Sequence, residues 1–124
     1  ARNVMNKTNI VLQTAGTSKR EYLYTADAVT AILTVLLHGK TGEAYNAGNP
    51  ETYCSIREMA QLVAEQIAGK MINVHVAEDT ESGEHKFPPA HHLHLDVSKL
   101  KNIGWQPTRG LKEMYLRMIA EMEE

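Results

Sequence analysis

The segment from Thr25 to Leu37 restricts the possible folds more than any other part of the chain, because it is apolar around almost the whole circumference of a helix. We expect Thr25 or Asp27 to cap this helix and Gly39 to end it. Apolar side chains follow helical spacing at Val29, Ile32, Leu33 and Leu36, and the further apolar positions are Ala28, Ala31, Val35 and Leu37. Such a helix has to be covered on more than one side, so we expect the isolated chain to form a homo-oligomer.

Strand-like and helix-like patterns alternate along the chain, which predicts an α/β fold with a small mixed sheet and helices. The expected strands are 10–13, 22–24, 43–47 and 71–76, with a short extended piece at 91–95. Further helices are expected at 55–69, opened by a capping box of Ser55 and Glu58, at 96–102 behind an Asp96 cap, and at 111–122. Trp105 is expected in the core. The 124 residues suit one small domain, 1–124, with 43% hydrophobic side chains.

Composition and charge exclude several classes of function. Thirteen basic against fifteen acidic side chains give a formal net charge of -2, which leaves no overall footprint for nucleic acid. The longest apolar run, 31–37, is far shorter than a membrane span, and no signal-peptide pattern is present. The single Cys54 excludes an internal disulfide and favours a reducing compartment, so we expect a cytoplasmic protein.

A polar loop that ends in an arginine points to a local anion site. The loop is Gly16-Thr17-Ser18-Lys19, and Arg20 closes it ahead of an aromatic stretch. A guanidinium group can hold phosphate oxygens through two parallel hydrogen bonds. Together with the helix that follows and the strand expected at 43–47, the loop forms a layout that can hold a phosphate near a sheet edge.

The stretches R-E-Y-L-Y-T-A-D at 20–27 and G-E-A-Y-N-A-G at 42–48 carry a resemblance to a known family. The chain resembles the extended short-chain dehydrogenases/reductases that act on nucleotide-sugars, namely NAD-dependent epimerases, 4,6-dehydratases and decarboxylases. The ending I-G-W-Q-P at 103–107 also matches that family. The resemblance extends from about Ile10 to the last helix. It implies the C-terminal, substrate-binding part of a Rossmann-type enzyme whose ligand is a nucleotide-diphosphate sugar.

The resemblance implies which residues contact the substrate. Arg20 matches the family arginine that contacts the diphosphate, while Ser18 replaces the glutamine usual in the preceding loop. Lys86 stands where an arginine is usual, and it keeps the positive charge without the planar fork. The remaining implied contacts are Val11, Leu12 and Gln13 against the nucleobase, and Ser55 at a position that contacts substrate in some members.

The groups that carry the chemistry of this family are missing from the chain. No glycine-rich loop suits a dinucleotide, since the nearest spacing, Gly39-x-x-Gly42, follows a helix and ends it. No tyrosine has a lysine four residues on, so the proton-transfer pair is absent as well. We therefore expect no catalytic, cofactor-binding or metal residue here, with NAD implied only for a full-length parent. The polar start at Ala1, which reads as the end of a helix, suggests a fragment that is inactive without an N-terminal dinucleotide-binding domain.

Three alternatives stay open. Arg20 could be a solvated side chain that pairs with Glu21 or Asp27. The chain could be a free-standing, non-catalytic α/β module that binds a ligand or a protein. Four histidines, with Glu84 and Asp96 nearby, could begin a zinc site, although histidine-rich surface loops are commoner than metal sites: His85, His91, His92 and His94.

Overall fold

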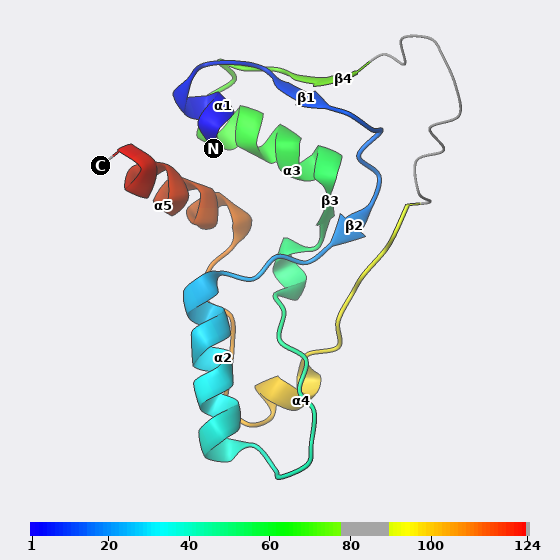
Figure 1. Ribbon diagram of the computed structural model, residues 1–124, viewed down its shortest axis with the longest axis vertical. Helices are drawn as coiled ribbons and strands as arrows, with labels where there is room; N and C mark the ends of the chain where they lie inside the picture. Colours follow the sequence, from blue (N-terminus) through cyan, green and yellow to red (C-terminus); the bar gives the residue numbers. More distant parts are fainter. Residues whose placement is uncertain (78–89, 124) are drawn as a thin grey trace.

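The computed structural model describes residues 1–77 and 90–123 of the chain (Figure 1). In order, its helices and strands are α1 (Arg2–Met5), β1 (Ile10–Leu12), β2 (Lys19–Arg20), α2 (Thr25–His38), β3 (Cys54–Ser55), α3 (Ile56–Leu62), β4 (Val74–Val76), α4 (Ser98–Lys101) and α5 (Leu111–Glu123). A 3-10 turn spans Pro50–Thr52, and a π-helical turn, Val63–Ile67, continues α3. None of the described helices is long and apolar enough to cross a membrane.

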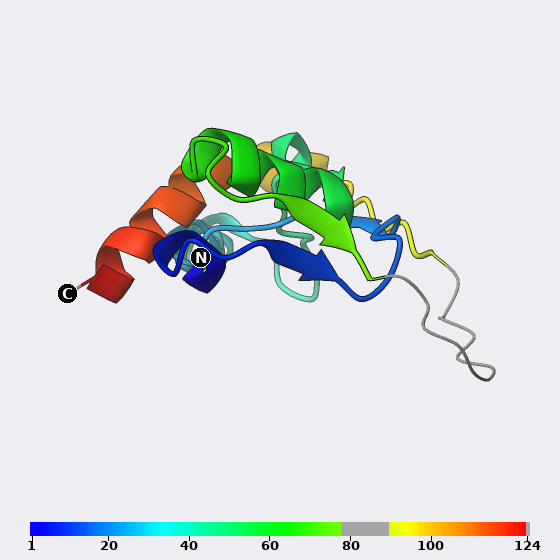
Figure 2. The same cartoon turned by 90° about the horizontal axis from the view of Figure 1, so that it is seen from above.

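The four strands form two small sheets, and the predicted α/β class is confirmed. β1 and β4 are parallel, with Ile10 opposite Val74, whereas β2 and β3 are antiparallel, with Lys19 opposite Ser55. α3 lies over one face of the parallel pair, which is clearest in the view from above (Figure 2). Ala64 and Ala68, at the end of this helical segment, are buried with Ile72 in one small core, against which Ile10 of β1 and Val74 of β4 pack.

A second core lies between α2, α4 and the segment that leads to α5. Its buried members are Ala31 of α2, Leu100 of α4 and Trp105, which is 3% exposed, as expected of a core residue. The indole Nε1–H of Trp105 is 3.1 Å from both the Asp27 carbonyl oxygen and the Thr30 hydroxyl. This second core therefore joins the first turn of α2 to the end of the chain.

The capping box is confirmed and so is the extent of the helix behind it. The Glu58 amide donates to the Ser55 hydroxyl at 3.0 Å, and the Ser55 amide donates to the Glu58 carboxylate at 2.7 Å. Two amides that a helix start leaves without partners are thus satisfied reciprocally. The helical segment ends at Gly69, whose φ of +59° is the left-handed conformation that glycine adopts without strain.

The strand predicted at 22–24 is wrong. The extended pairing occurs earlier, at Lys19–Arg20, and no strand is assigned between Glu21 and Tyr24. The reason is a side chain: the Tyr22 amide donates to the Thr52 hydroxyl at 2.8 Å, and that hydroxyl lies 2.7 Å from the Tyr22 carbonyl oxygen. Because a buried threonine pairs both backbone groups of Tyr22, they are not available to a strand ladder.

The strand predicted at 43–47 is not formed within the described residues either. Only one side of α2 is packed, and its second apolar side is exposed, as expected for the isolated chain. The side of α2 that packs against the second core carries Ala31 and Val35. The opposite side is exposed by 50–77% and comprises Val29, Ile32, Leu33, Leu36 and Leu37, which we call the outer α2 face. Apolar residues occupy both sides of this helix, so periodicity alone could not select the packed one.

The predicted cap of α2 is wrong as well, because Asp27 has another role. Tyr24 is the N-cap residue and makes no side-chain capping bond. Asp27 is 3% exposed and accepts three hydrogen bonds: from the Thr108 hydroxyl (2.6 Å), the Thr108 amide (2.9 Å) and the Arg109 amide (3.2 Å). Burial raises the pKa of Asp27, but these hydrogen bonds outweigh it and lower the pKa below its usual value of 3.8.

Asp27→Asn is predicted to lower the free energy of unfolding by about 2–3 kcal/mol, because an amide cannot accept all three bonds and turns a donor toward donors. Urea unfolding measures this. The lowered pKa stabilises the native state above the unfolded-state pKa, and this contribution is lost as pH falls through the native-state pKa. The difference between the variant and the wild type should therefore shrink on acidification below about pH 4.

Asp96→Asn is the matched control, since the exposed Asp96 carboxylate accepts one bond, from the Ser98 amide at the start of α4 (2.9 Å). It should change the free energy of unfolding by less than about 1 kcal/mol. An Asp27→Asn variant with an unchanged urea midpoint at neutral pH would contradict the role given to Asp27.

Candidate functional site

Arg20 is the last residue of β2, at the surface of the molecule. Its side chain is exposed, and within the described residues its guanidinium has neither a hydrogen bond nor an ion pair. The two carboxylates that were its expected partners are engaged elsewhere: Glu21 pairs with His94, and Asp27 is bonded to residues 108–109. The described contacts therefore leave the Arg20 side chain able to bind a ligand.

The polar loop before Arg20 is fastened to the start of α3. The Ile56 amide donates to the Ser18 carbonyl at 3.2 Å, and the Arg57 amide donates to the Gly16 carbonyl at 3.0 Å. Gly16 is buried with φ of +67°, and a Cβ there would lie 3.1 Å from the Arg57 nitrogen. A glycine is thus required for both conformation and space, and the loop is rigidly placed beside the capping box.

Ser18 links the loop to a third segment. Its hydroxyl accepts from the His91 amide at 3.2 Å. Next to it, the Lys19 amide donates to the His91 carbonyl at 2.8 Å, and the Leu93 amide donates to the Lys19 carbonyl at 3.0 Å. β2 therefore lies between β3 on one side and the 91–93 segment on the other, and all three adjoin the polar loop at 16–19, which we call the arginine loop.

Further basic side chains belong to the elements next to Arg20. Lys19 precedes it in β2, and Arg57 lies in the first turn of α3, beside the loop. The one described carboxylate that pairs with Lys19 is Glu58, at 3.8 Å between two exposed groups, which is a weak interaction. Two histidines, His91 and His92, are exposed on the adjoining segment. Such a set suits an anionic ligand such as a phosphate.

The other residues implied as substrate contacts belong to different elements of the fold. Val11 and Leu12 belong to β1, in the parallel sheet, and Gln13 follows them as an exposed residue. Ser55 is brought beside the arginine strand as the partner of Lys19, but it is buried and its hydroxyl accepts the capping bond. Lys86 lies outside the described residues.

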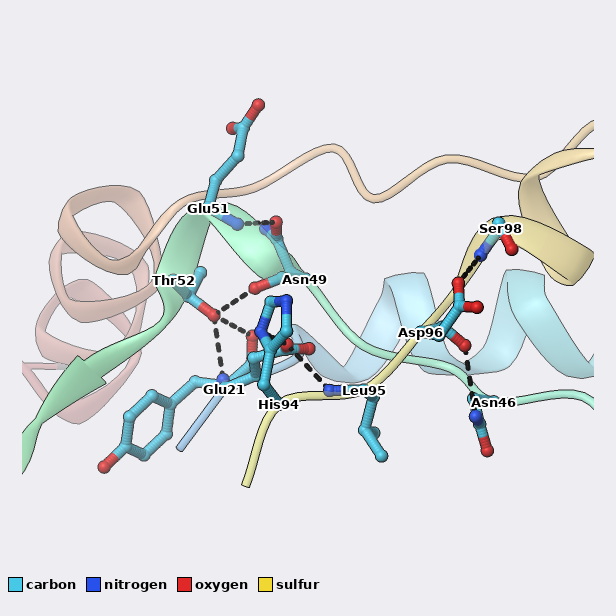
Figure 3. A network of polar contacts seen from close by, with 10 residues as sticks. Glu21, Asn46, Asn49, Glu51, Thr52, His94, Leu95, Asp96 and Ser98 are labelled. Atoms are coloured by element: carbon cyan, nitrogen blue, oxygen red, sulfur yellow. Dashed lines mark hydrogen bonds and ion pairs between the residues drawn. The ribbon is translucent and has the colours of Figure 1, made fainter. Parts of the chain in front are cut away.

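The sequence reasoning missed Glu21, which connects the site to the rest of the fold. Its side chain is 4% exposed, and its Oε1 lies 2.7 Å from His94 Nδ1 and accepts from the Leu95 amide at 3.1 Å (Figure 3). Its Oε2 is buried with no hydrogen bond from the described residues. A Cβ on Gly48 would lie 2.4 Å from that oxygen. Gly48, the last residue of the motif at 42–48, is therefore the sequence feature that could have indicated this contact, because it leaves space for the Glu21 carboxylate.

Side chains also organise the turn between Gly48 and β3. The side-chain oxygen Oδ1 of Asn49 accepts from the Glu51 amide at 3.1 Å. The side-chain nitrogen Nδ2 of Asn49 donates to the Arg109 carbonyl at 2.9 Å. Asn49 and Thr52 are almost wholly buried, and Thr52 holds Tyr22 from the same turn. The polar network drawn in Figure 3 thus sets the position of β3 opposite Arg20.

The pKa shifts of the ionisable groups near the site are opposite to those that proton transfer requires. Burial raises the pKa of Tyr22 and of Tyr115, and burial followed by the negative charge of Glu58 raises the pKa of the Cys54 thiol. A proton-transferring tyrosine or a nucleophilic thiol needs a lowered pKa. The arrangement can therefore hold a charged ligand, but these groups are not activated for chemistry.

The histidines do not gather into a metal cluster within the described residues, where no three potential ligands lie together. His94 is instead bonded to Glu21, and its ring meets the Tyr53 ring edge-on at 5.1 Å between centroids. His85 and Glu84, which belonged to the zinc alternative, lie outside the described residues.

Gly48→Ala is predicted to lower the free energy of unfolding by about 1–3 kcal/mol, because the new methyl group has to displace the buried Glu21 carboxylate. Denaturant unfolding measures the loss, and faster exchange of the Leu95 amide should accompany it. Gly110→Ala is the control, since a Cβ there meets nothing within 4 Å. Equal effects of the two substitutions would contradict the close approach of Glu21 to Gly48.

Comparisons with known proteins identify the family of the chain. Residues 1–48 match the NAD dependent epimerase/dehydratase family. Human dTDP-D-glucose 4,6-dehydratase is 32% identical over 104 residues, which covers 80% of this chain and 28% of the human protein. The low-salt glycan biosynthesis protein Agl12 of Haloferax volcanii is 27% identical over 92 residues, covering 74% of this chain and 27% of that relative. The chain thus spans little more than a quarter of the length of these relatives.

Solved structures share the fold. The UDP-glucose 4-epimerase of Thermotoga maritima, solved with UDP-glucose, has a TM-score of 0.74 at 20% identity and matches 98% of this chain and 38% of its own. The dTDP-glucose 4,6-dehydratase of Bacillus anthracis, solved with NAD, has a TM-score of 0.72 at 21% identity over the same shares. At these identities the similarity concerns the fold, which is one found within Rossmann-type epimerases and dehydratases.

Proposed function

Because the chain belongs to the NAD-dependent epimerase/dehydratase family, we propose that it is the nucleotide-sugar-binding portion of such an enzyme. The expected reaction class is that of UDP-glucose 4-epimerase or dTDP-glucose 4,6-dehydratase, which are the names carried by its relatives and structural neighbours. The chain by itself supplies substrate contacts and no catalytic group.

The observation that carries the proposal is the state of Arg20. Its guanidinium has no partner among the described residues, and it sits on a strand whose two neighbours are both held by backbone hydrogen bonds. A permanently charged, planar guanidinium can bind two phosphate oxygens at once, so less rotamer entropy is lost for each hydrogen bond that forms. The diphosphate of a nucleotide-sugar is the ligand proposed for Arg20, with Lys19 adding local positive charge.

The other contacts are proposed with specific roles. The end of β1, where Val11 and Gln13 are exposed and Leu12 is half-buried, is the proposed surface for the nucleobase. Lys86 is proposed as a second cation for the diphosphate. Since the Ser55 hydroxyl is already bonded within the capping box, its contribution is proposed to come through the placement of Lys19 opposite it.

The cofactor and the catalytic pair are proposed to come from a dinucleotide-binding domain outside the 124 residues. The support is the share of the relatives' length, 27–28%, that the chain spans. NAD is the proposed cofactor of the complete enzyme, and the cytoplasmic location expected from Cys54 stays a prediction. The coding sequence upstream should specify a glycine-rich loop and a tyrosine-lysine pair; their absence would favour the free-standing binding module.

Arg20→Ala is predicted to weaken binding of a UDP-, dTDP- or GDP-sugar by about 10- to 100-fold, because charge-assisted bonds to the diphosphate are lost. Isothermal titration calorimetry with the complete protein measures the dissociation constant. Arg20→Lys should fall between the alanine variant and the wild type, since it keeps the charge but not the fork.

The control for this titration is Arg2→Ala, which removes an exposed arginine from α1 and should leave affinity unchanged. If Arg20→Ala binds the same nucleotide-sugar as tightly as wild type, the diphosphate role is wrong. If no nucleotide-sugar binds the wild type, the proposed function as a whole is wrong.

The 124-residue chain alone is predicted to form a homo-oligomer through the outer α2 face, because five exposed apolar side chains on one side of a helix favour association in water. Multi-angle light scattering over a concentration series measures the mass. Leu36→Asp, at a position that is 77% exposed, should shift the mass toward a monomer without unfolding the chain. A wild-type chain that stays monomeric at high concentration would contradict the prediction.

A further inference from the structure

The segment 91–93 lies against β2 in a register that fixes which of its side chains share a face with Arg20. Lys19 and His92 form a parallel bridge, in which the Lys19 amide donates to the His91 carbonyl and the Leu93 amide donates to the Lys19 carbonyl. Residues paired across strands have their side chains on the same face, and successive residues alternate between faces. Lys19 and His92 therefore share one face. Arg20 shares the opposite face with His91 and Leu93.

Contacts further along the two segments agree with this alternation. Glu21 and His94 stand two positions after the bridged pair, and the Oε1 of Glu21 lies 2.7 Å from the Nδ1 of His94 (Figure 3). Lys19 itself is 3.8 Å from the Glu58 carboxylate. Both carboxylates that contact this small sheet thus lie on the face of Lys19 and His92.

Within the described residues, the face that carries Arg20 receives no carboxylate from β2, β3 or the 91–93 segment. Cys54 shares this face as the cross-strand partner of Arg20. Burial raises the pKa of Cys54 and of the nearby Tyr22, so both stay neutral near pH 7. The other titratable side chains of the adjoining elements are Arg57 at the start of α3 and, on the opposite face, Lys19, Glu21, Glu58, His92 and His94.

The backbone of His91 is held while its imidazole stays available. Its amide donates to the Ser18 hydroxyl at 3.2 Å, and its carbonyl accepts from the Lys19 amide at 2.8 Å. The side chain is exposed, and within the described residues it has neither a hydrogen bond nor an ion pair. Strand spacing places the Cα atoms of His91 and Arg20 roughly 8 Å apart, one strand across and two residues along. The two side chains can therefore reach oxygens of one diphosphate.

We propose that His91 is a further cationic contact for the diphosphate, and that it makes the affinity of this site for a nucleotide-sugar depend on pH. Its imidazolium and the Arg20 guanidinium bind phosphate oxygens from two adjacent strands of one face. The adjacent His92 has no such role, because its side chain lies on the opposite face. The inference rests on the proposed function, since its ligand is the one proposed for Arg20.

The pH dependence follows from the chemistry of the two partners. A histidine side chain is the group that changes its charge between about pH 5 and pH 8. Both phosphates of a nucleotide-sugar are esterified, so the ligand keeps its charge over that range. The guanidinium of Arg20 is permanently charged as well. Tighter binding on mild acidification is therefore assigned to the histidine.

Titration calorimetry of the complete protein with a UDP-, dTDP- or GDP-sugar, at about pH 6 and about pH 8, tests the proposal. His91→Ala should weaken binding by about 5- to 10-fold at the lower pH and by less than about 2-fold at the higher one, because a charge-assisted bond is lost only where the imidazole is charged. His91→Arg should bind tightly at both pH values. An alanine variant that binds as tightly as the wild type at the lower pH overturns the proposal, and so does an equal loss at both.

His92→Ala is the matched comparison, since it removes the same side chain one residue further on and from the other face. It should change the affinity by less than about 2-fold at both pH values. Equal losses in His91→Ala and His92→Ala would overturn the proposal, because the register would then not decide which histidine binds.

Arg20→Ala separates this inference from the proposed function. If Arg20→Ala weakens binding and His91→Ala does not at either pH, the diphosphate role of Arg20 stands and the role of His91 is wrong. If no nucleotide-sugar binds the wild type at either pH, the proposed function fails and the role of His91 fails with it.

Discussion

The buried carboxylate of Asp27 holds together the parts of the chain on which the remaining structure depends. It accepts its three hydrogen bonds from Thr108 and Arg109, far away in the sequence, and the indole of Trp105 donates to its carbonyl. An ionised carboxylate is removed from water at a large cost, so it is stable only with these donors in place. The first turn of α2 and the segment before α5 consequently have one relative position, and the core around Ala31 and Leu100 forms between them.

The same principle places the arginine loop. Glu21, the residue after Arg20, is buried against Gly48 and accepts from Leu95, while Thr52 takes the backbone groups of Tyr22. These contacts stop β2 after two residues and leave Arg20 at its exposed end. A site for a charged ligand on this scaffold thus depends on neighbours that never touch the ligand, because they remove the freedom of the backbone that carries the guanidinium.

Sequence reasoning succeeded where the signal lies within a few residues. The capping box of Ser55 and Glu58 involves residues close together in the chain, and so does the helix end at Gly69. Both can therefore be recognised from the sequence. It failed for the strand at 22–24, where aromatic residues favoured an extended ladder and a threonine thirty residues away took the hydrogen bonds instead. The sequence indicated which residues form the loop before Arg20. It did not indicate the hydrogen bonds from Ile56, Arg57 and His91 that hold this loop in place.

The sequence by itself determined the α/β class, the places where most helices begin and end, and the residues that carry the family motifs, because these follow from local periodicity, capping and spacing. Only the tertiary structure decided that α2 turns Ala31 and Val35 inward, that Glu21 is buried beside Gly48, and that Asp27 bonds to the segment before α5 rather than capping its own helix. Each of these depends on two segments distant in the chain that compete for one space or one hydrogen-bond partner. That competition is settled by packing, which no local pattern encodes.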